Sequence, residues 1–381
     1  MKVNDVIILG AGASGLMCGA FLPKNLDIVM LEHNEKIAKK LKISGGGKCN
    51  LTNVVVSSHN YDGNEIAIEY ALNLFSKEKL LEFFQKEGVE IVLRKGRYYF
   101  CKNSSQEIID VLQRKTKHIK KYMQTEIKSV VKEDELFYVE TTKGKFCAKK
   151  VIVATGGKSF GSVGASDIGL QIAKNFGLKV KEFTPALVGL TVQKEQFFFK
   201  ELSGLSVYVH ITVDDKVLKE DMLFTHKGLS GPVVLSASLY WKKGEISIDF
   251  LPSHTIEQLI KNSKKLLSST LPLPKRLSKV LLEAVGVEDI FCSKVDGTTM
   301  QKLQKLHNYS FAPAGNFGFS KAEVSKGGVL MRELNPYTLE SLDISGLYFI
   351  GEVVDVTGEL GGYNFQWAFS SGVVCAKSFV V

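Results

Sequence analysis

Three glycines near the start of the chain follow a short apolar run and precede a helical pattern. They have the spacing G-x-G-x-x-G and are Gly10, Gly12 and Gly15. In such a turn the first glycine permits a tight bend, the second lets backbone approach a pyrophosphate, and the third lets the helix pack on the strand. Backbone amides at the start of the helix, at Ala13 and Ser14, then face the anion. With a strand at 6–9 and a helix over 14–22, the pattern predicts a dinucleotide-binding βαβ unit.

Glu32 directly follows the second strand of this unit, residues 27–31. A carboxylate at that position accepts hydrogen bonds from the ribose hydroxyls of a dinucleotide. The N-terminal position of the unit and the use of glutamate favour FAD, and they also permit NAD. No second strand–G-x-G-x-x-G–helix unit follows in the sequence. We therefore expect no separate NAD(P)H domain, so any NAD(P)H would be a transient reductant that visits the flavin directly.

A second glycine-rich loop, S-G-G-G-K-C-N, occupies residues 44–50. Consecutive glycines let backbone lie against a flat ligand. Lys48 is a candidate to meet a phosphate or a reduced flavin, and Cys49 is a candidate proton donor. The alternative is a flexible loop with a buried cysteine. The candidate cofactor contacts in this loop are Gly46, Gly47, Lys48, Cys49 and Asn50.

Three more glycine turns lie at the ends of strands or at the start of a helix. The candidate contacts in them are Thr155, Gly156 and Gly157 after one strand, Gly351, Glu352 and Asp355 after another, and Gly362, Tyr363 and Asn364 before a helix. A carboxylate in the second turn could bind ribityl hydroxyls. A helix N-terminus at the third could stabilise negative charge on a reduced flavin. Each turn alone is consistent with an ordinary connection, but together they favour one cofactor site.

The middle of the chain has a different pattern, with short strands followed by short Lys-rich amphipathic helices. We therefore expect an α/β fold in which a Rossmann-type FAD-binding domain is assembled from both chain ends. The expected parts are 1–186 and 313–381 for that domain, 187–253 for an inserted β-rich, barrel-like domain, and 254–312 for an inserted helical subdomain. Periodicity also predicts single helices over 69–88 and 254–270.

The charge, the cysteine count and the apolar content of the chain limit which partners, metal sites and compartments are expected. The chain has 381 residues and a formal net charge of +9, which suits an anionic partner such as nucleic acid and equally suits a solvated lysine-rich surface. Its six cysteines are far apart without a C-x-x-C, and its histidines form no ligand cluster, so we expect neither a metal site nor a redox pair. No run of about 20 apolar residues indicates a membrane span. Reduced cysteines favour the cytoplasm.

Four segments together resemble a family of bacterial FAD-binding oxidoreductases described as BaiN-like or aminoacetone-oxidase-like. The segments are SGGGKCNLTN (44–53), FTHKGLSGP (224–232), AEVSKGGV (322–329) and GEVVDVTGELGGYNFQWAFSSG (351–372). The resemblance covers nearly the whole chain, and it implies the same division into an FAD domain and inserted domains.

The resemblance also implies roles for residues. By this likeness Gly10, Gly12, Gly15 and Glu32 hold the ADP half of FAD, Gly46, Gly47, Lys48, Cys49 and Asn50 lie against the cofactor, and Gly351, Glu352, Asp355, Asn364 and Gln366 surround the flavin half. Two departures limit the transfer. Lys48 replaces the usual arginine, so a point charge stands where a planar fork is expected. The loop at 159–169 lacks the usual Pro-Lys and Gly-Asp-Gly.

Three functions are consistent with these features. Members of the family reduce a uridine of 23S ribosomal RNA to dihydrouridine, and an anionic substrate suits the basic chain. Another description implies oxidation of a small amine such as aminoacetone. The third possibility is a non-catalytic FAD protein that binds RNA or ribosomes. Catalysis on uridine needs an acid beside the flavin, for which Cys49 and His226 are the candidates. The expected RNA surface comprises Lys261, Lys264, Lys265, Lys275, Arg276 and Lys279.

Overall fold

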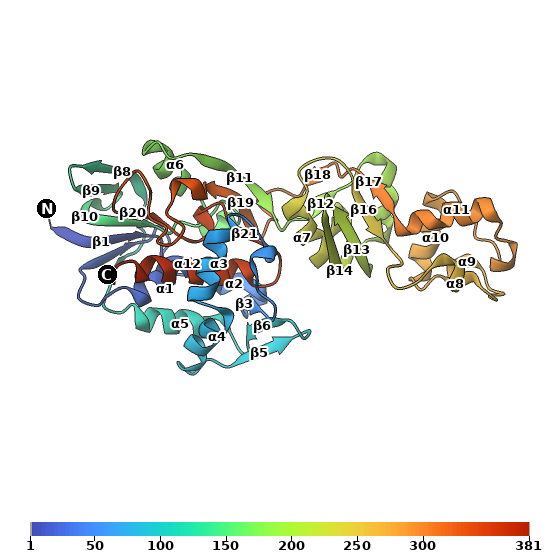
Figure 1. The fold of residues 1–381 in the computed structure, drawn as a ribbon, viewed down its shortest axis with the longest axis horizontal. Helices are drawn as coiled ribbons and strands as arrows, with labels where there is room; N and C mark the ends of the chain where they lie inside the picture. The colour runs from blue at the N-terminus through green and yellow to red at the C-terminus, as the bar shows by residue number, and fades with distance from the viewer. Residues whose placement is uncertain (1, 381) are drawn as a thin grey trace. The chain divides into compact units, whose positions relative to one another are not determined.

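The computed structural model describes residues 2–380, and these form two compact units (Figure 1). One unit contains the residues up to Pro185 together with those from Glu323 onward, and the other contains Ala186–Ala322. Segments from both ends of the chain therefore share the first unit. The α/β fold class expected from the sequence is confirmed.

A seven-stranded sheet forms the centre of the first unit. Its parallel strands, in spatial order, are β7 (Lys120–Tyr122), β2 (Ile28–Leu31), β1 (Val3–Leu9), β10 (Gly144–Val153) and β20 (Leu347–Phe349). Two antiparallel strands continue from the first half of β10: β9 (Leu136–Thr141) and β8 (Ile127–Glu133). In the C-terminal strand β20, Phe349 lies opposite Val153. This pairing joins the two ends of the chain in one sheet.

The parallel strands are buried and apolar at the centre of the sheet: all of β2 and β20, and the carboxyl ends of β1 and β10. From Val6 to Leu9 no side chain is more than 1% exposed, and all four residues of β2 are buried. Parallel strands covered on both faces read as continuous apolar runs because neither face meets water. Each fully buried Val, Leu or Ile side chain contributes roughly 1.5–3 kcal/mol relative to exposure, so these runs hold the sheet that carries the site.

The helices of the first unit pack on this sheet or on one another. In chain order they are α1 (Ala13–Phe21), α2 (Lys39–Gly47), α3 (Glu65–Leu74), α4 (Lys77–Gln85), α5 (Ser105–Lys115), α6 (Ile168–Asn175) and α12 (Tyr363–Lys377). The N-terminal helix α1 and the C-terminal helix α12 lie side by side (Figure 1). A Cβ atom at Gly372 would lie 2.7 Å from the Ser14 carbonyl oxygen. This close approach therefore requires glycine.

Three small sheets surround the turns of the first unit. They pair β3 (Asn50–Asn53) with β6 (Tyr98–Cys101) and β6 with β5 (Ile91–Arg94), β4 (Tyr61–Asp62) with β21 (Thr357–Gly358), and β11 (Val180–Ala186) with β19 (Val324–Val329). Each of these sheets pairs strands that are far apart in the sequence. These sheets join residues 50–53 to 98–101, residues 61–62 to 357–358, and residues 180–186 to 324–329.

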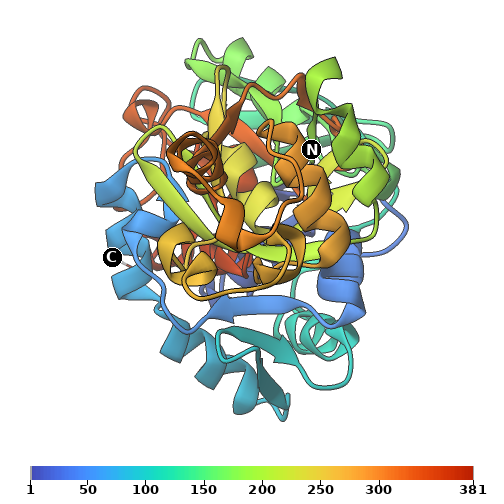
Figure 2. The same cartoon turned by 90° about the vertical axis from the view of Figure 1, so that its right-hand side faces the viewer.

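The second unit contains another seven-stranded sheet and short helices. In spatial order the strands are β17 (Tyr309–Phe311), β16 (Ile246–Asp249), β13 (Ser206–Val213), β14 (Lys216–Thr225), β15 (Gly228–Ser230), β12 (Leu190–Thr191) and β18 (Gly315–Asn316). The helices are α7 (Pro232–Tyr240), α8 (Ile256–Ile260), α9 (Leu267–Thr270), α10 (Lys275–Ala284) and α11 (Gly297–Gln304). Figure 2 shows helices α8 to α11 in yellow-orange to orange.

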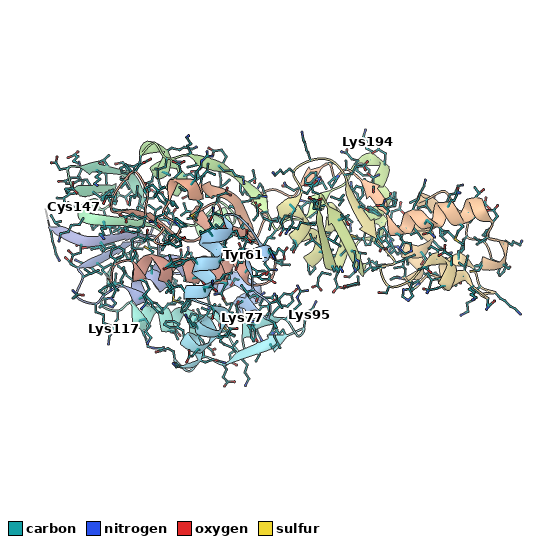
Figure 3. All side chains as sticks on the ribbon, in the orientation of Figure 1. Tyr61, Lys77, Lys95, Lys117, Cys147 and Lys194 are labelled. Carbon is teal, nitrogen blue, oxygen red and sulfur yellow. The ribbon has the colours of Figure 1, made fainter. Side chains whose placement is uncertain are left out.

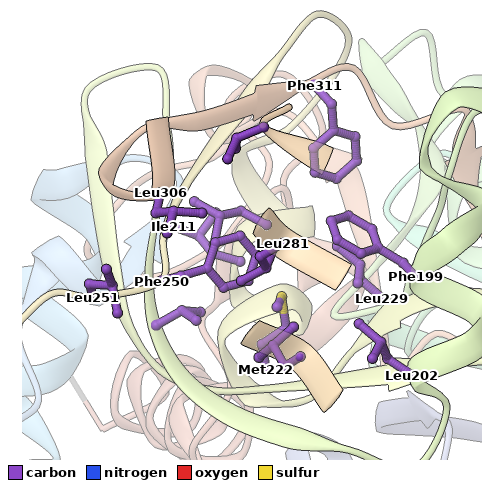
Figure 4. Packing of buried hydrophobic residues seen from close by; sticks show 14 of the residues in the cluster. Phe199, Leu202, Ile211, Met222, Leu229, Phe250, Leu251, Leu281, Leu306 and Phe311 are labelled. Atoms are coloured by element: carbon purple, nitrogen blue, oxygen red, sulfur yellow. The ribbon is translucent and has the colours of Figure 1, made fainter. Parts of the chain in front are cut away.

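One apolar cluster joins the sheet and the helices of the second unit. Figure 4 shows side chains of the sheet, such as Ile211 and Met222, in the same cluster as Leu281 of α10 and Phe199. All four are fully buried. The sheet and the short helices therefore share one continuous core rather than forming two separate ones.

The single helices expected over 69–88 and 254–270 are wrong. In the first, Ser76 separates α3 from α4, and its hydroxyl accepts the Lys79 N–H at 3.4 Å as the cap of a new helix. In the second, a non-helical connection separates α8 from α9. Apolar periodicity continues through both breaks, so periodicity alone does not reveal them. Within residues 2–380 we find no helix with the length and apolar character needed to cross a membrane.

Candidate cofactor site

The predicted glycine turns meet at one edge of the main sheet. Gly10 follows β1, Glu32 follows β2, Thr155 lies just beyond β10, and Gly351 lies just beyond β20. These strands are parallel neighbours, so their carboxyl ends lie together. Ligands of open α/β sheets bind at this edge. The structure thus brings the turns from both chain ends to one place.

The turn before α1 leaves a gap at its centre. A Cβ at Gly10 would lie 2.5 Å from the Ala154 carbonyl oxygen, and one at Gly15 would lie 2.2 Å from the Gly10 carbonyl oxygen. At Gly12 a Cβ would have no neighbour within 4 Å. The first and third glycines are therefore needed for packing, whereas the second leaves open space.

The N-terminus of α1 faces that space with backbone amides. The first hydrogen bond within the helix runs from the Leu16 N–H to the Gly12 carbonyl oxygen at 3.0 Å, and Gly12 provides no side-chain cap. The amides ahead of Leu16, including those of Ala13 and Ser14, precede the first intrahelical donor. A helix start with bare amides and the positive end of its dipole binds a phosphate group.

Glu32 is held as a carboxylate at the end of β2. It is 6% exposed, and it accepts the Ala11 N–H at 2.8 Å and the Asn34 N–H at 2.9 Å. Burial opposes its ionisation, but hydrogen bonds from His33, Asn34 and Ala11 bring the pKa of Glu32 below its ordinary value. The contact with Glu32 in turn raises the pKa of His33, whose Nδ1 lies 3.1 Å away.

The second glycine loop forms the end of α2 and has a bare backbone. Gly46 and Gly47 have φ angles of 65° and 79°, and a Cβ at either would have no neighbour within 4 Å. A Cβ at Gly45, in contrast, would lie 2.8 Å from the Phe100 ring. The loop is thus packed against Phe100 at Gly45 and open at Gly46 and Gly47. Backbone without side chains at these two positions can lie directly against a flat ligand. Lys48, half-buried, follows directly.

Cys49 lies beneath this loop rather than on its surface. Its side chain is 0% exposed, and burial raises the pKa of the Cys49 thiol well above its usual range. Strand pairing places Asn50 opposite Phe100, so Cys49 and Cys101 are cross-strand neighbours. This pair was not expected from the sequence, because the two residues are far apart in the chain.

Three buried polar atoms in the two short strands β3 and β21 have no hydrogen-bond partner among the described residues. They are Asn50 Oδ1, Thr52 Oγ1 and Thr357 Oγ1. They belong to β3 and β21, which both pack against α12. Unpaired polar atoms are costly in a protein interior, so such a group is expected to meet a bound molecule. The flavin ring of FAD is flat and carries polar atoms on its edge, so these residues and the glycine loop fit it.

Glu352 is the centre of a polar cluster beyond β20. Its carboxylate pairs with Lys40 at 2.7 Å and accepts the Ser325 N–H at 2.8 Å. A Cβ at Gly157 would lie 2.8 Å from Glu352 Oε1. The Ser325 hydroxyl accepts the Ser159 N–H at 2.9 Å. Sequence reasoning missed Lys40 and Ser325, although Ser325 belongs to the segment 322–329 that carried the family resemblance.

The remaining predicted contacts hold α12 and its approach. The Asn364 amide donates to the Gly358 carbonyl oxygen at 2.8 Å, and Gln366 Nε2 donates to the Phe75 carbonyl oxygen at 3.0 Å. Burial raises the pKa of Asp355, whose carboxylate lies 3.3 Å from Lys181 Nζ. These side chains fix the segments that surround the edge of the sheet.

Tyr363 and Gly362 form the start of α12 itself. Gly362 has a φ of 92° and precedes the first helical residue. Tyr363 is 3% exposed, and its backbone carbonyl accepts the Tyr61 hydroxyl at 3.0 Å. Burial raises the pKa of Tyr363 to about 12, against the opposing effect of Arg97.

His226 belongs to the second unit, whereas Cys49 belongs to the first. His226 is exposed in the two-residue turn between β14 and β15. The stretch from Lys261 to Lys279, also in the second unit, has six cationic residues and no acidic one. All six are exposed, and they lie in or between α8 and α10.

This arrangement defines an oxidoreductase with the dinucleotide-binding fold of flavoproteins. Residues 4–378 match the HI0933-like protein Rossmann domain family, and the chain belongs to that family. The resemblance inferred from the four segments is thereby confirmed. A protein of Haemophilus influenzae named ribosomal RNA dihydrouridine synthase is 36% identical over 99% of this chain and 98% of its own length.

The chain is also similar to a second named protein and to a solved structure. A protein of Clostridium scindens named 3-dehydro-bile acid delta(4,6)-reductase is 29% identical over 99% of both chains. Among solved structures, the 3-ketosteroid delta1-dehydrogenase from Sterolibacterium denitrificans aligns with a TM-score of 0.54 at 11% identity, over 100% of this chain and 99% of its own. The likeness to that structure concerns the fold alone.

Proposed function

We propose that this protein is an FAD-dependent reductase that converts a uridine of 23S ribosomal RNA to dihydrouridine, with NAD(P)H as the ultimate donor. The observation that supports FAD as the cofactor is the glycine loop with open space at Gly46 and Gly47, together with three buried polar atoms that have no partner among the described residues. The 36% identity over nearly the full length to a protein named for this activity supports the reaction. We expect the protein in the cytoplasm, where its RNA substrate is present.

FAD would be held by two groups of residues. The ADP half fits the turn before α1 and Glu32, and the flavin half fits the second glycine loop and the segments around α12. Bound FAD supplies a hydride donor that is reduced by NAD(P)H and reduces an electron-poor double bond. The residues proposed to hold it are Gly10, Gly12, Ala13, Ser14, Gly15, Glu32, Gly46, Gly47, Lys48, Cys49, Asn50, Thr155, Gly156, Gly157, Gly351, Glu352, Asp355, Gly362, Tyr363, Asn364 and Gln366.

The overall reaction balances with one nicotinamide and one proton. The C5–C6 double bond of the uracil takes up a hydride at one carbon and a proton at the other, while NAD(P)H becomes NAD(P)+. The protein has to supply the proton from a group that is protonated at neutral pH. Cys49 meets that condition, as a thiol with an ordinary or raised pKa is protonated at neutral pH, and it lies two positions after Gly47 of the glycine loop. His226, in the exposed turn of the second unit, is the other candidate.

The second unit supplies a surface suited to RNA. Residues 261–279 carry six positive charges without an acidic residue, and the net charge of the whole chain is +9. Binding of cationic side chains to phosphates releases counterions and gives most of the sequence-independent affinity for nucleic acid. We propose that this stretch contacts the ribosomal RNA around the target uridine.

The decisive experiment is nucleoside mass spectrometry of 23S rRNA from a strain that lacks the gene. We expect one dihydrouridine to disappear, and to return when the gene is restored or when purified protein, FAD and NAD(P)H are added to RNA from that strain. An unchanged dihydrouridine content would reject the proposed RNA substrate. Oxidation of aminoacetone by the purified protein would then be the next activity to measure.

A further inference from the structure

The hairpin of β5 and β6 carries a cluster of cationic side chains. Between Glu90 and Glu107 the sequence has four cationic residues and no acidic one. Arg94, Lys95 and Arg97 lie at the turn of the hairpin, whereas Lys102 follows β6 and pairs with Glu90 at 2.6 Å. A tight turn joins the strands, with the Arg97 N–H donating to the Arg94 carbonyl oxygen at 3.1 Å. Lys95 is labelled in this turn in Figure 3. The hairpin therefore holds its arginines at fixed backbone positions.

Each arginine of the hairpin lies over an aromatic ring of β6. The Arg94 Cζ is 5.0 Å from the centroid of Phe100, and the Arg97 Cζ is 4.9 Å from the centroid of Tyr98. The guanidinium of Arg97 also acts to lower the pKa of the Tyr363 phenol, against the effect of burial. Residues two apart in a strand point to the same face, so both rings, with their guanidinium groups, share one face of the hairpin.

That same face closes on the candidate cofactor site. A Cβ at Gly45 would lie 2.8 Å from Phe100 Cε1, and a Cβ at Gly361 would lie 2.9 Å from Tyr98 Cε1. These two glycines begin the two loops that we propose to hold the flavin half of FAD. The ring of Phe100 thus lies beside both Gly45 and the Arg94 guanidinium, and the ring of Tyr98 lies beside both Gly361 and the Arg97 guanidinium.

We propose that Arg94 and Arg97 bind the phosphates that flank the uridine to be reduced. A guanidinium is a planar, permanently charged fork that matches the oxygens of a phosphate, and stacking on a ring holds its plane. A base that has left its stack to reach the site needs its backbone held nearby, and single-stranded RNA is recognised by aromatic and arginine planes. This inference rests on the proposed RNA substrate and adds a second contact surface, in the first unit.

The test compares the holoenzyme with the double variant Arg94→Gln/Arg97→Gln. The probe is a short single-stranded oligouridylate, with binding followed by fluorescence anisotropy over a range of KCl concentrations. Loss of two phosphate contacts lowers the slope of log affinity against log salt by about 1.4 for a single strand. We also expect the dissociation constant at low salt to rise roughly tenfold or more. Flavin absorbance per chain verifies that both proteins are folded and loaded.

A matched control removes the same charge elsewhere in the first unit. Arg114→Gln/Lys115→Gln changes two cations of α5 that pair with Glu87, and we expect it to bind the probe as the wild type does. If the wild type binds but the hairpin variant has the same slope and affinity, the phosphate contacts are refuted while the RNA substrate stands. If the control variant loses as much affinity for the oligouridylate as the hairpin variant, the loss comes from the lower net charge of the protein. The inference about Arg94 and Arg97 then also fails. If the wild-type protein binds no RNA, both proposals fail.

Discussion

The side-chain oxygen Oδ1 of Asn50 lies 2.8 Å from the position that a Cβ atom would take at Gly362. Asn50 begins β3 and Gly362 precedes α12, so the contact joins segments from opposite ends of the chain. The oxygen is buried and has no hydrogen-bond partner among the described residues. A side chain at position 362 would collide with this oxygen and with the Thr52 backbone, so the contact requires glycine. Several variants test whether the cofactor lies beside these segments.

Gly12→Val should abolish FAD retention without unfolding the protein. A valine at this position enters open space rather than a packed contact, and it therefore occupies the place proposed for the pyrophosphate. Flavin absorbance per chain and a thermal melt of the apoprotein measure the two effects. Gly15→Val is the contrasting variant, because its side chain would collide with the Gly10 carbonyl and should lower the melting temperature. Full FAD occupancy in Gly12→Val would contradict the assignment of the turn.

Thr52→Val should weaken FAD binding but leave the apoprotein as stable as the wild type. The Thr52 hydroxyl is buried and unpaired in the protein, so its removal loses no internal hydrogen bond, and replacement by an isosteric apolar group is close to neutral. Titration of apoprotein with FAD and urea unfolding separate these quantities. A matched control is Thr116→Val, because the Thr116 hydroxyl donates to the Leu112 carbonyl at 2.7 Å and its loss should cost stability instead. Equal FAD affinity in Thr52→Val would remove this hydroxyl from the site.

Cys49→Ser should reduce dihydrouridine formation by about 10²–10⁴-fold, the range for loss of a general acid. The reason is that the buried thiol stays protonated at neutral pH and lies beside the glycine loop. Cys101→Ser, its cross-strand neighbour, is the control and should retain activity. The flavin should still be reduced by NAD(P)H in Cys49→Ser, as measured by bleaching. Full turnover in this variant would leave His226 as the remaining candidate, to be tested by His226→Gln.

His33 should make the stability of the apoprotein depend on pH through its contact with Glu32. The carboxylate raises the pKa of His33 above 6.5 in the folded protein, so the folded state binds the proton more tightly than the unfolded chain. Its contribution is complete below the unfolded-state pKa and is lost as pH rises through the folded-state pKa. The side chain is 42% exposed, so the effect should be under about 1 kcal/mol. Urea unfolding of the wild type and His33→Gln at about pH 5.5 and 8.5 should give a larger difference at the lower pH.

Reversal of three charges in the basic stretch should weaken RNA binding and flatten its salt dependence. Lys264→Glu/Lys265→Glu/Lys279→Glu removes exposed cations from the second unit, and each lost phosphate contact lowers the salt slope by about 0.7–0.9. FAD content should be unchanged, because the proposed cofactor residues lie in the first unit. The matched control reverses Lys117, Lys128 and Lys145, which are exposed in the first unit. Equal losses in both triple variants would show that only net charge matters.

The local backbone structure around the candidate site was predicted from the sequence. The turn at Gly10, Gly12 and Gly15 was expected between a strand and a helix, and the structure has β1 and α1 there. Such turns are specified by a few neighbouring residues, because glycine alone tolerates their backbone and their close approach to carbonyl groups. The family followed from segments of the same kind. Breaks within helices were missed, because Ser76 interrupts a pattern that remains apolar on either side.

The sequence by itself determined which backbone segments can approach a ligand, and only the tertiary structure decided which side chains meet around it. Lys40 and Glu352 are 312 positions apart and pair at 2.7 Å, and Asn50 reaches Gly362 across a similar separation. No local pattern encodes such contacts, because they depend on β20 joining β10 and on α12 packing against α1. Backbone conformation is set by neighbours in sequence, whereas contacts between side chains are set by the packing of the whole unit.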